Sequence, residues 1–333
     1  MATVERPRYV FGPVPSRRLG RSLGVDVVSM KTCVFNCLYC QLGRTTYQTI
    51  TRAEYVPVVE VMAELEAFLE HGGQADHITF SGSGEPTLHS RLGEMIAHTK
   101  HLTEIPLAVL TCGALLHEPE VRRDLLAADV VLPSLDAALP KTFQEINRPH
   151  GRLHLAQMIE GLKQFRREYR GQIWLEIMFV KGINDGAEEV RLLRQAVLEI
   201  APDKVHLNTV VRPPAESAAQ PLAPAELQAI AGLLGPSAEV IAERQSLPKL
   251  ATDKHLVPEL LNLMARHPVT LPDIGEYFNC NQEIIWWLLN SLIDEGMVEV
   301  RYHRGRKFYT TRAPVTHSAA KTEAVAAVLQ EEL

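Results

Sequence analysis

The sequence predicts an α/β protein in which a partial (βα)6 barrel is followed by a C-terminal winged-helix domain. Over the first two thirds of the chain, short apolar runs alternate with segments of helical apolar spacing. This alternation is typical of a parallel sheet that is buried on both faces. A connector rich in Pro and Ala follows at 213–224, and the rhythm then changes to helices and a β-hairpin.

The elements of the barrel are predicted from these periodicities. The stretch 1–21 is rich in Arg, Pro and Gly and is expected to be an ordered loop. The predicted strands are 22–30, 77–83, 106–112, 129–136, 172–180 and 204–211. The predicted helices are 53–70, 88–102, 118–127, 153–169 and 186–200. Such βα units form an open sheet or a barrel, and six are too few for the eight-stranded barrel, so we favour a six-stranded partial barrel.

The chain is expected to divide into three parts. The barrel and its N-terminal loop cover 1–245, with a further helix at 225–235 and a short strand at 238–244. The winged-helix domain covers 246–312, and an Ala- and Glu-rich tail covers 313–333 as a loose or disordered helix. Within the winged-helix domain, helices at 257–266, 271–278 and 280–295 precede a hairpin that turns at His303-Arg304-Gly305.

Composition restricts the class of protein. A hydrophobic fraction of 46% is that of a globular chain, and a net charge of -6 means that any nucleic-acid contact must be local. No apolar run reaches about 18 residues, so no membrane span is expected. The N-terminus has no apolar signal core. The five cysteines are grouped three, one and one, which favours metal binding in a reducing cytoplasm over disulfides.

The three grouped cysteines are Cys33, Cys37 and Cys40, spaced C-x3-C-x2-C directly after the first predicted strand. Ferredoxin-type clusters are tied by four cysteines, so three thiolates would leave one iron open to another ligand. A structural zinc site is the alternative, and it would make the protein a zinc-stabilised scaffold. Zinc usually takes two pairs of ligands, whereas the remaining cysteines, Cys112 and Cys280, are isolated.

This motif, its place after the first strand, and Tyr39 before the third cysteine resemble the radical S-adenosylmethionine (SAM) superfamily. The resemblance implies a [4Fe-4S] cluster on the three cysteines and SAM on the open iron. It also implies an external one-electron reductant of the flavodoxin or ferredoxin type. SAM would then split to methionine and a 5′-deoxyadenosyl radical that abstracts hydrogen from a substrate.

The turn at Ser81–Pro86 resembles the Gly-Gly-Glu motif of that superfamily, with Ser83 in place of one glycine. Glycine lets the backbone approach a ligand closely, and Gly84 is therefore a candidate cofactor contact. The resemblance implies that Glu85 accepts a charge-assisted hydrogen bond from the ammonium group of SAM. The alternative is an ordinary turn between a strand and a helix.

Three later strands supply further candidates for the SAM site. Ser134 and Asp136 are two residues apart and point to the same side, where the resemblance implies contacts to the ribose or the carboxylate of SAM. A helix cap is the alternative for this pair. Glu176 and Met178 share one face of their strand and are expected to line the barrel, and Asn208 ends the strand that contacts adenine in the superfamily.

Cys112 ends the strand 106–112 and is the candidate catalytic thiol, as a hydrogen-atom donor, a substrate-side thiol or an extra ligand. A small buried thiol is the alternative. Five basic residues lie in loops that are expected to flank the pocket, where they would bind phosphate, an anionic substrate or the carboxylate of SAM. The alternative is a set of solvated or structural ion pairs. These residues are Arg17, Arg18, Arg21, Arg148 and His150.

A narrower resemblance rests on GPVPSRRLGRSLGVD, FSGSGEPTLH, ADVVLPSLDA, INRPHGRLH, LEIMFVKGIND and LNTVVRPP, between residues 12 and 215. Together these stretches resemble the branch related to the tRNA wyosine-base synthases. Those synthases carry a second cluster on three more cysteines, and only Cys112 and Cys280 remain here, so that cluster is excluded. A modified RNA nucleoside is the first substrate hypothesis, and a peptide or protein is the second.

The predicted winged helix has an acidic recognition helix, because 280–296 contains no Lys or Arg. That charge is wrong for phosphate, so sequence-specific DNA binding is disfavoured. Basic residues lie only on the hairpin, at Arg301, Arg304, Arg306 and Lys307. The domain would dock on the barrel, bind a peptide or protein substrate, or contact RNA through the hairpin, and the alternative is a structural accessory domain or a dimer contact. A redox-sensing regulator that binds DNA through this domain is the rival function.

Overall fold

The computed structural model describes residues 9–241, 256–278 and 282–312. The predicted boundary at 245/246, the tail 313–333 and Cys280 lie outside the described residues. An eight-stranded sheet organises the barrel, in the order β1-β2-β5-β6-β7-β8-β9-β10. The strands are β1 Val10–Ser16, β2 Gly20–Val25, β5 His77–Phe80, β6 Leu107–Thr111, β7 Val130–Pro133, β8 Gln172–Phe179, β9 Lys204–Thr209 and β10 Ala238–Val240. Only β1 runs antiparallel to its neighbour.

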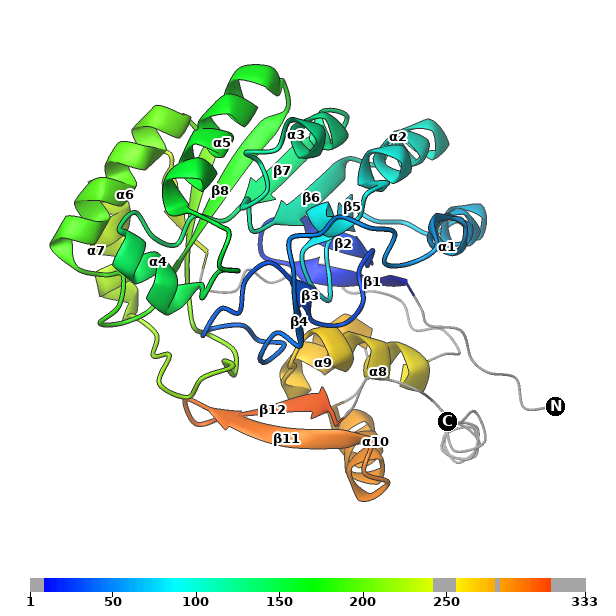
Figure 1. The fold of residues 1–333 in the computed structure, drawn as a ribbon. Coiled ribbons are helices and arrows are strands. Elements are labelled where there is room, and N and C mark those ends of the chain that lie inside the picture. Colours follow the sequence, from blue (N-terminus) through cyan, green and yellow to red (C-terminus); the bar gives the residue numbers. More distant parts are fainter. Residues whose placement is uncertain (1–8, 242–255, 279–281, 313–333) are drawn as a thin grey trace.

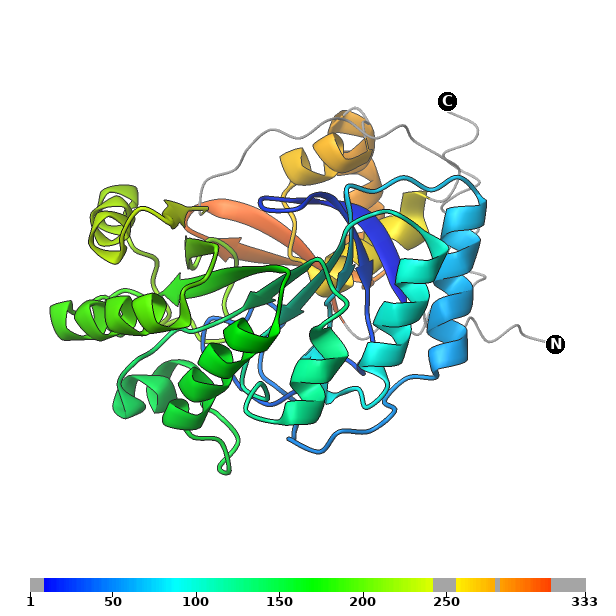
Figure 2. The same cartoon turned by 90° about the horizontal axis from the view of Figure 1, so that it is seen from above.

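Helices cover the outer face of this curved sheet (Figures 1 and 2). They are α1 Val58–Glu70, α2 Leu92–Leu102, α3 Pro119–Leu125, α5 Leu155–Glu168, α6 Ala187–Ile200 and α7 Pro224–Leu234. The shorter helix α4 Pro140–Ile146 and the 3-10 turn η1 Pro86–Leu88 follow the carboxyl ends of β7 and β5. Outward-facing strand residues such as Leu23, Phe80 and Val131 are fully or almost fully buried against these helices. The inner face carries a smaller core around Leu19, Leu132 and Trp174.

All six predicted parallel strands are present, which confirms an α/β fold with a mostly parallel sheet. The prediction of a loop over 1–21 was wrong, because Val10–Ser16 forms β1. Pro13 and Pro15 made this stretch resemble a loop. An edge strand tolerates proline, and β1 is an edge strand with a bulge between Phe11 and Val14.

Three further elements, one helix and a pair of strands, are too short to be predicted from the sequence. The helix α4 spans seven residues with proline at its first position, and the two-residue strands β3 Thr32–Cys33 and β4 Tyr47–Gln48 pair with each other. Both places lie beside the cysteine loop. The short elements therefore shape the region that matters most for function.

The C-terminal unit has the predicted order of three helices and a hairpin. Its elements are α8 Leu256–Arg266, α9 Leu271–Phe278, α10 Gln282–Asp294, β11 Val298–His303 and β12 Arg306–Thr311. Arg304 and Gly305 both adopt positive φ, as a tight hairpin turn of type I′ requires. The unit has its own core, to which Val14 of β1 also packs.

This unit lies on the side of the sheet opposite the helices (Figures 1 and 2). It contacts both ends of the sheet. On the β1 side, the Arg266 guanidinium stacks over the Phe11 ring at 4.6 Å. On the β9 side, His303 Nε2 lies 2.9 Å from the Val210 carbonyl oxygen. Within the described ranges, no helix is long and apolar enough to cross a membrane.

Candidate functional site

The cysteine loop begins at β3, beyond the carboxyl end of β2. Its backbone is held by the segment after α4, since Asn36 N donates to the Asn147 carbonyl and Leu38 N to the Ile146 carbonyl, both at 3.0 Å. Cys33, Cys37 and Cys40 are half-buried free thiols. The loop is thus a fixed part of the barrel, and the predicted grouping of the three cysteines is retained in space.

Burial governs the chemistry of these thiols. It raises the pKa of Cys33 to about 12, with a further contribution from the Glu85 carboxylate. Burial and Asp136 likewise raise the pKa of Cys37. Ligand thiols must lose their protons when metal binds, so a metal group at this site would add its positive charge to that of Lys31 in stabilising the thiolates.

Two nitrogen donors face the sulfur atoms. Lys31 Nζ lies 3.1 Å from Cys40 Sγ, and Asn147 Nδ2 lies 3.5 Å from Cys37 Sγ. In the described part of the chain, no His, Cys, Asp and Glu side chains are grouped to hold a single metal ion. A four-iron cluster places its ligands on separate irons, so they need not converge on one point. Three thiols with nearby N–H donors have the donor chemistry of a cluster site.

Glu85 is buried beside this loop, and its carboxylate accepts hydrogen bonds from backbone and side-chain groups of the protein. Oε1 accepts from the Thr87 amide at 3.1 Å and from the hydroxyls of Thr87 and Thr111 at 2.6 Å each. Oε2 accepts from the Cys112 amide at 2.7 Å. Glu85 therefore caps η1 and joins the ends of β5 and β6, in addition to any ligand that it contacts.

The glycines of the Ser81–Pro86 turn are required by the protein itself. A Cβ atom on Gly84 would lie 1.8 Å from the Thr32 carbonyl oxygen, and one on Gly82 would meet the Asp26 carboxylate. The Glu85 amide also donates to the Thr32 carbonyl at 3.0 Å. This turn is consequently packed directly onto the residue that precedes Cys33.

Asp136 joins three parts of the site. Its carboxylate accepts from Tyr39 Oη at 2.5 Å, Asn147 Nδ2 at 2.7 Å and the Met178 amide at 2.9 Å. Burial raises the pKa of Asp136 to about 6. The predicted residues Tyr39, Asp136 and Met178 thus come together, with Ser134 bridged to Glu176 nearby.

Asn208 lies in a second polar network, nearer the barrel opening. Its Nδ2 donates to Glu176 at 2.9 Å, while Arg17 Nη1 donates to its Oδ1 at 3.1 Å. Arg18 forms a 2.7 Å ion pair with Glu176, and together with the Asn208 hydrogen bond it holds the pKa of that carboxylate below its usual range despite burial. Arg17 and Arg18 thus contact side chains of β9 and β8, and a structural ion pair is one of the roles that the sequence left open for them.

Cys112 follows β6 and is half-buried. Its pKa is raised by burial and by the neighbouring Glu85 and Cys33. The thiol therefore lies close to Cys33 and Glu85, and its catalytic role stays a prediction.

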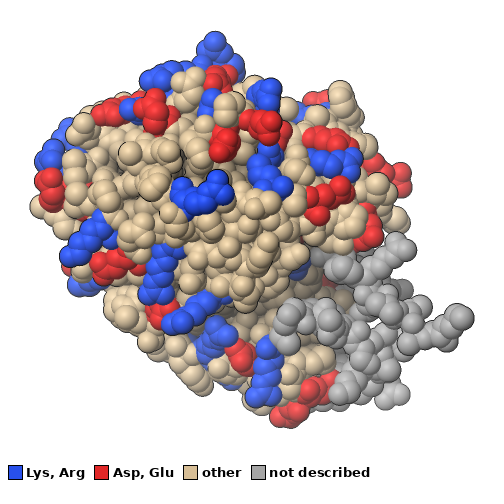
Figure 3. Space-filling model, in the orientation of Figure 1, with Lys and Arg blue, Asp and Glu red and all other residues tan. Residues whose placement is uncertain are grey.

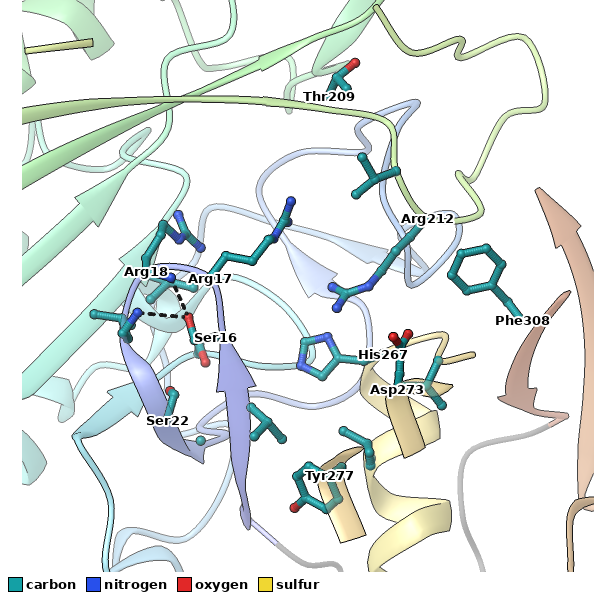
Figure 4. A pocket seen from close by; sticks show the side chains of 18 of the residues that line it. Ser16, Arg17, Arg18, Ser22, Thr209, Arg212, His267, Asp273, Tyr277 and Phe308 are labelled. Carbon is teal, nitrogen blue, oxygen red and sulfur yellow. Dashed lines mark hydrogen bonds between the residues drawn. The ribbon is translucent and has the colours of Figure 1, made fainter. Parts of the chain in front are cut away.

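A cavity of about 570 Å³ opens beside Arg17 and Arg18, and none of the described cysteines lines it. Its walls are the inner faces of β2 and β5, the β1–β2 turn, the chain after β9 and the C-terminal unit (Figure 4). Charged and imidazole side chains on its walls are Arg17, Arg18, Arg212, His267, Asp273, His303, Arg304 and Arg306. Two of the three hairpin arginines, Arg304 and Arg306, therefore line the cavity.

Sequence reasoning missed two contacts between the barrel and the C-terminal unit. Arg266 Nε lies 3.2 Å from Asp26 Oδ2, and Asp26 also accepts from the Ser83 amide and hydroxyl. Gln41, the residue after Cys40, contacts Arg212 and His267. In the sequence, one weak signal marked each residue. Asp26 is a charged residue among the inward-facing positions of the first predicted strand, and Gln41 directly follows a cysteine of the motif.

Comparison with known proteins identifies the class. Residues 27–193 match the model of the Radical SAM superfamily, and the chain belongs to this superfamily. Membership makes the protein an enzyme and implies SAM and a [4Fe-4S] cluster as its cofactors. Within the superfamily, the chain is 32% identical over 308 residues to the UPF0026 protein MJ1312 of Methanocaldococcus jannaschii, covering 90% of this chain and 94% of that protein.

Other relatives differ more in length or sequence. A protein of Brachyspira hyodysenteriae named GTPase Obg is 38% identical over 296 residues, which are 88% of this chain but 44% of that protein. This chain has no Gly-Lys pair and hence no P-loop sequence. A probable dual-specificity RNA methyltransferase RlmN of Chlorobium phaeobacteroides is 25% identical over 177 residues, 50% of this chain and 48% of that protein.

A solved structure supports the fold. The radical SAM methyltransferase from Sphaerobacter thermophilus superposes with a TM-score of 0.50 at 19% identity, over 67% of each chain. At this identity the similarity concerns the architecture of the barrel alone.

Proposed function

We propose that this enzyme holds a [4Fe-4S] cluster on Cys33, Cys37 and Cys40 and cleaves SAM reductively beside it. The observation that carries the proposal is the proximity of Glu85 and Cys112 to Cys33 of the cysteine loop, at the carboxyl ends of the strands. Bound together, the cluster and SAM supply a one-electron cleavage that ends in hydrogen abstraction from a substrate. The electron comes from an external reductant of the flavodoxin or ferredoxin type.

The chain's own residues would prepare this reaction in distinct ways. Tyr39 fixes the end of the cysteine loop through Asp136. Because Gly84 has no side chain, the Ser81–Pro86 turn packs directly against the cysteine loop, and the backbone of the turn and Glu85 would lie beside the ligand. Ser134, Met178 and Asn208 line the SAM site on the inner face. Cys112 would lie next to the reacting atoms, where a thiol can donate a hydrogen atom.

The proposed substrate is an RNA nucleotide. A cavity of about 570 Å³ is in the size range of small-ligand sites, and enzymes that modify bases take single nucleotides out of the stack into such pockets. The arginines on its walls suit a phosphate-bearing ligand, although the whole chain carries a charge of -6. A peptide remains the second candidate, because a carboxylate also binds arginine.

We further propose that the C-terminal unit is a winged helix that serves as a wall of the substrate cavity. Lys and Arg side chains lie on the hairpin β11–β12 (Figure 3), and two of them, Arg304 and Arg306, line the cavity. A DNA-binding regulator would instead need this hairpin and a basic recognition helix free for the duplex. The enzyme is therefore favoured over the regulator.

Anaerobic reconstitution with iron and sulfide tests the proposal. We expect about four irons per chain, and release of 5′-deoxyadenosine from SAM after reduction. Adding bulk tRNA should raise the yield of 5′-deoxyadenosine and produce a nucleoside of altered mass that needs enzyme, SAM and reductant together. An intact cluster without SAM cleavage would overturn the enzymatic proposal. Cleavage that responds to a peptide pool and not to RNA would overturn the substrate.

A further inference from the structure

We propose that Arg17, Arg212 and His267 form an oxyanion site in the cavity, which binds a phosphate or carboxylate group of the substrate. The inference rests on the proposed function, because it assigns the group by which the substrate is held. The three residues come from the β1–β2 turn, the chain after β9 and the C-terminal unit, and Figure 4 shows them around one space.

The hydrogen bonds of Gln41 determine what His267 presents to the cavity. Arg212 Nη1 lies 2.9 Å from Gln41 Oε1, and because a guanidinium only donates, the oxygen of the amide must face it. The amide nitrogen then faces the C-terminal unit, 2.9 Å from His267 Nδ1 and 3.3 Å from the Arg266 carbonyl. An amide nitrogen only donates, so His267 Nδ1 accepts.

The proton of neutral His267 therefore sits on Nε2, which is a hydrogen-bond donor. The imidazole stays neutral because burial, and then the nearby Arg212, Arg266 and Arg17, lower its pKa to about 3. The same influence of three arginines indicates a positive potential at the ring. A neutral N–H donor between guanidinium groups is suited to an anion and unsuited to a cation.

The charge on the cavity walls supports this assignment. Among the described residues, the lining carries five arginines and one carboxylate, Asp273. Arg18 pairs with Glu176, Arg17 donates to Asn208 Oδ1 and the Ile241 carbonyl, and Arg304 and Arg306 are exposed on the hairpin. The hairpin arginines would attract an anion to the mouth, while Arg17 and Arg212 lie deeper and half-buried, where charge interactions are less screened.

The position of the site gives it a function. Gln41 directly follows Cys40, so the amide that orients Arg212 and His267 belongs to the cysteine loop. An oxyanion bound there is held at a fixed distance from the proposed cluster. The rest of the substrate then extends towards Cys112 and the carboxyl ends of the strands.

Calorimetric titration of the full-length protein with inorganic phosphate at low ionic strength tests the site. We expect Arg212→Gln to weaken phosphate binding about tenfold and Arg304→Gln to weaken it about threefold, since Arg304 is exposed. Arg301→Gln is the matched control, because Arg301 lies on the same hairpin, pairs with Glu299 and does not line the cavity. It should leave the affinity within twofold.

A parallel titration with acetate distinguishes the two sources of the oxyanion. Acetate binding that Arg212→Gln weakens equally assigns a carboxylate, whereas binding of phosphate alone assigns a phosphate. Equal affinities of the wild type, R212Q and R304Q for both anions would overturn the site, and R304Q decides the matter if R212Q fails to fold. This test can fail or succeed independently of the proposed function. If the wild type did not cleave SAM, its measured affinities for phosphate and acetate would be the same.

Discussion

Arg266 Nε lies 3.2 Å from Asp26 Oδ2, with both side chains buried, so helix α8 of the C-terminal unit reaches the inner end of the first parallel strand. Burial raises the pKa of Asp26, and Arg266 opposes this rise. The pair also supports the Ser81–Pro86 turn, since Asp26 accepts from the amide of Ser83 at 3.2 Å. Docking of the C-terminal unit is thereby coupled to the geometry of the cysteine loop.

Removing Arg266 should leave a buried carboxylate without its counter-ion. We expect Arg266→Met to lower the free energy of unfolding by roughly 3–5 kcal/mol, and Asp26→Asn combined with it to restore part of the loss. Urea unfolding of the four members of this double-mutant cycle measures the coupling. The control is Arg21→Gln, whose partner Asp76 is exposed, with an expected cost of about 0–1 kcal/mol. Additive effects in the double variant would contradict the coupling.

Gly84 should tolerate no side chain. A methyl group there would lie 1.8 Å from the Thr32 carbonyl oxygen, so the turn and the cysteine loop would have to separate. Gly84→Ala is expected to cost about 3 kcal/mol or more and to reduce the iron bound on reconstitution. Gly232→Ala is the matched control in helix α7, where the new methyl meets open space and should stabilise by roughly 0.5–1 kcal/mol. Thermal unfolding and iron analysis compare the two.

The four described cysteines should separate into ligands and a non-ligand. Alanine at Cys33, Cys37 or Cys40 is expected to abolish the four-iron absorption after reconstitution. Cys112→Ala should still bind about four irons per chain but should no longer form product. Iron and sulfide analysis, with circular dichroism to check the fold, decides this. Loss of iron from Cys112→Ala would make Cys112 a ligand, and wild-type product formation would make it a packing residue.

Lys31 should raise the reduction potential of a bound cluster, because its ammonium lies 3.1 Å from Cys40 Sγ and is nearly buried. One partly screened charge is worth about 1 kcal/mol, which for a one-electron couple is about 40 mV. Lys31→Met is expected to shift the potential negatively by that order. Spectroscopic redox titration measures the shift, with Arg44→Met as an exposed control. An unchanged potential in Lys31→Met would exclude this tuning.

The sequence predicted the features that have local patterns. Apolar alternation marked all six parallel strands, and spacing marked the cysteine loop, because each depends on residues within a few positions. The partners of Asp26 could not be predicted, since Arg266 is 240 positions away and nothing near it signals the contact. The motif also suggested ligand contacts for Glu85 and Asp136, whereas the structure gives both carboxylates several protein partners, as buried charges require.

Acid should destabilise the protein through His206. This imidazole is 2% exposed, and burial, followed by the nearby Arg18, lowers its pKa to about 4. A histidine with a lowered folded pKa contributes stability that is complete above its unfolded pKa of about 6.5 and is lost as pH falls towards 4. The loss across this window is roughly 3 kcal/mol. Urea unfolding at several pH values should show a shallower loss for His206→Gln than for the wild type.

Ser83 stands where the superfamily motif has glycine, and its hydroxyl donates to the carboxylate that receives Arg266. The departure from the motif therefore belongs to the attachment of the C-terminal unit, and SAM need not be its cause. Asp26, Ser83 and Arg266 form a three-residue signature that spans most of the chain. Related sequences that carry this unit should keep all three residues together. Relatives without the C-terminal unit should tolerate glycine in place of Ser83, because no buried carboxylate then needs a hydrogen bond from a hydroxyl.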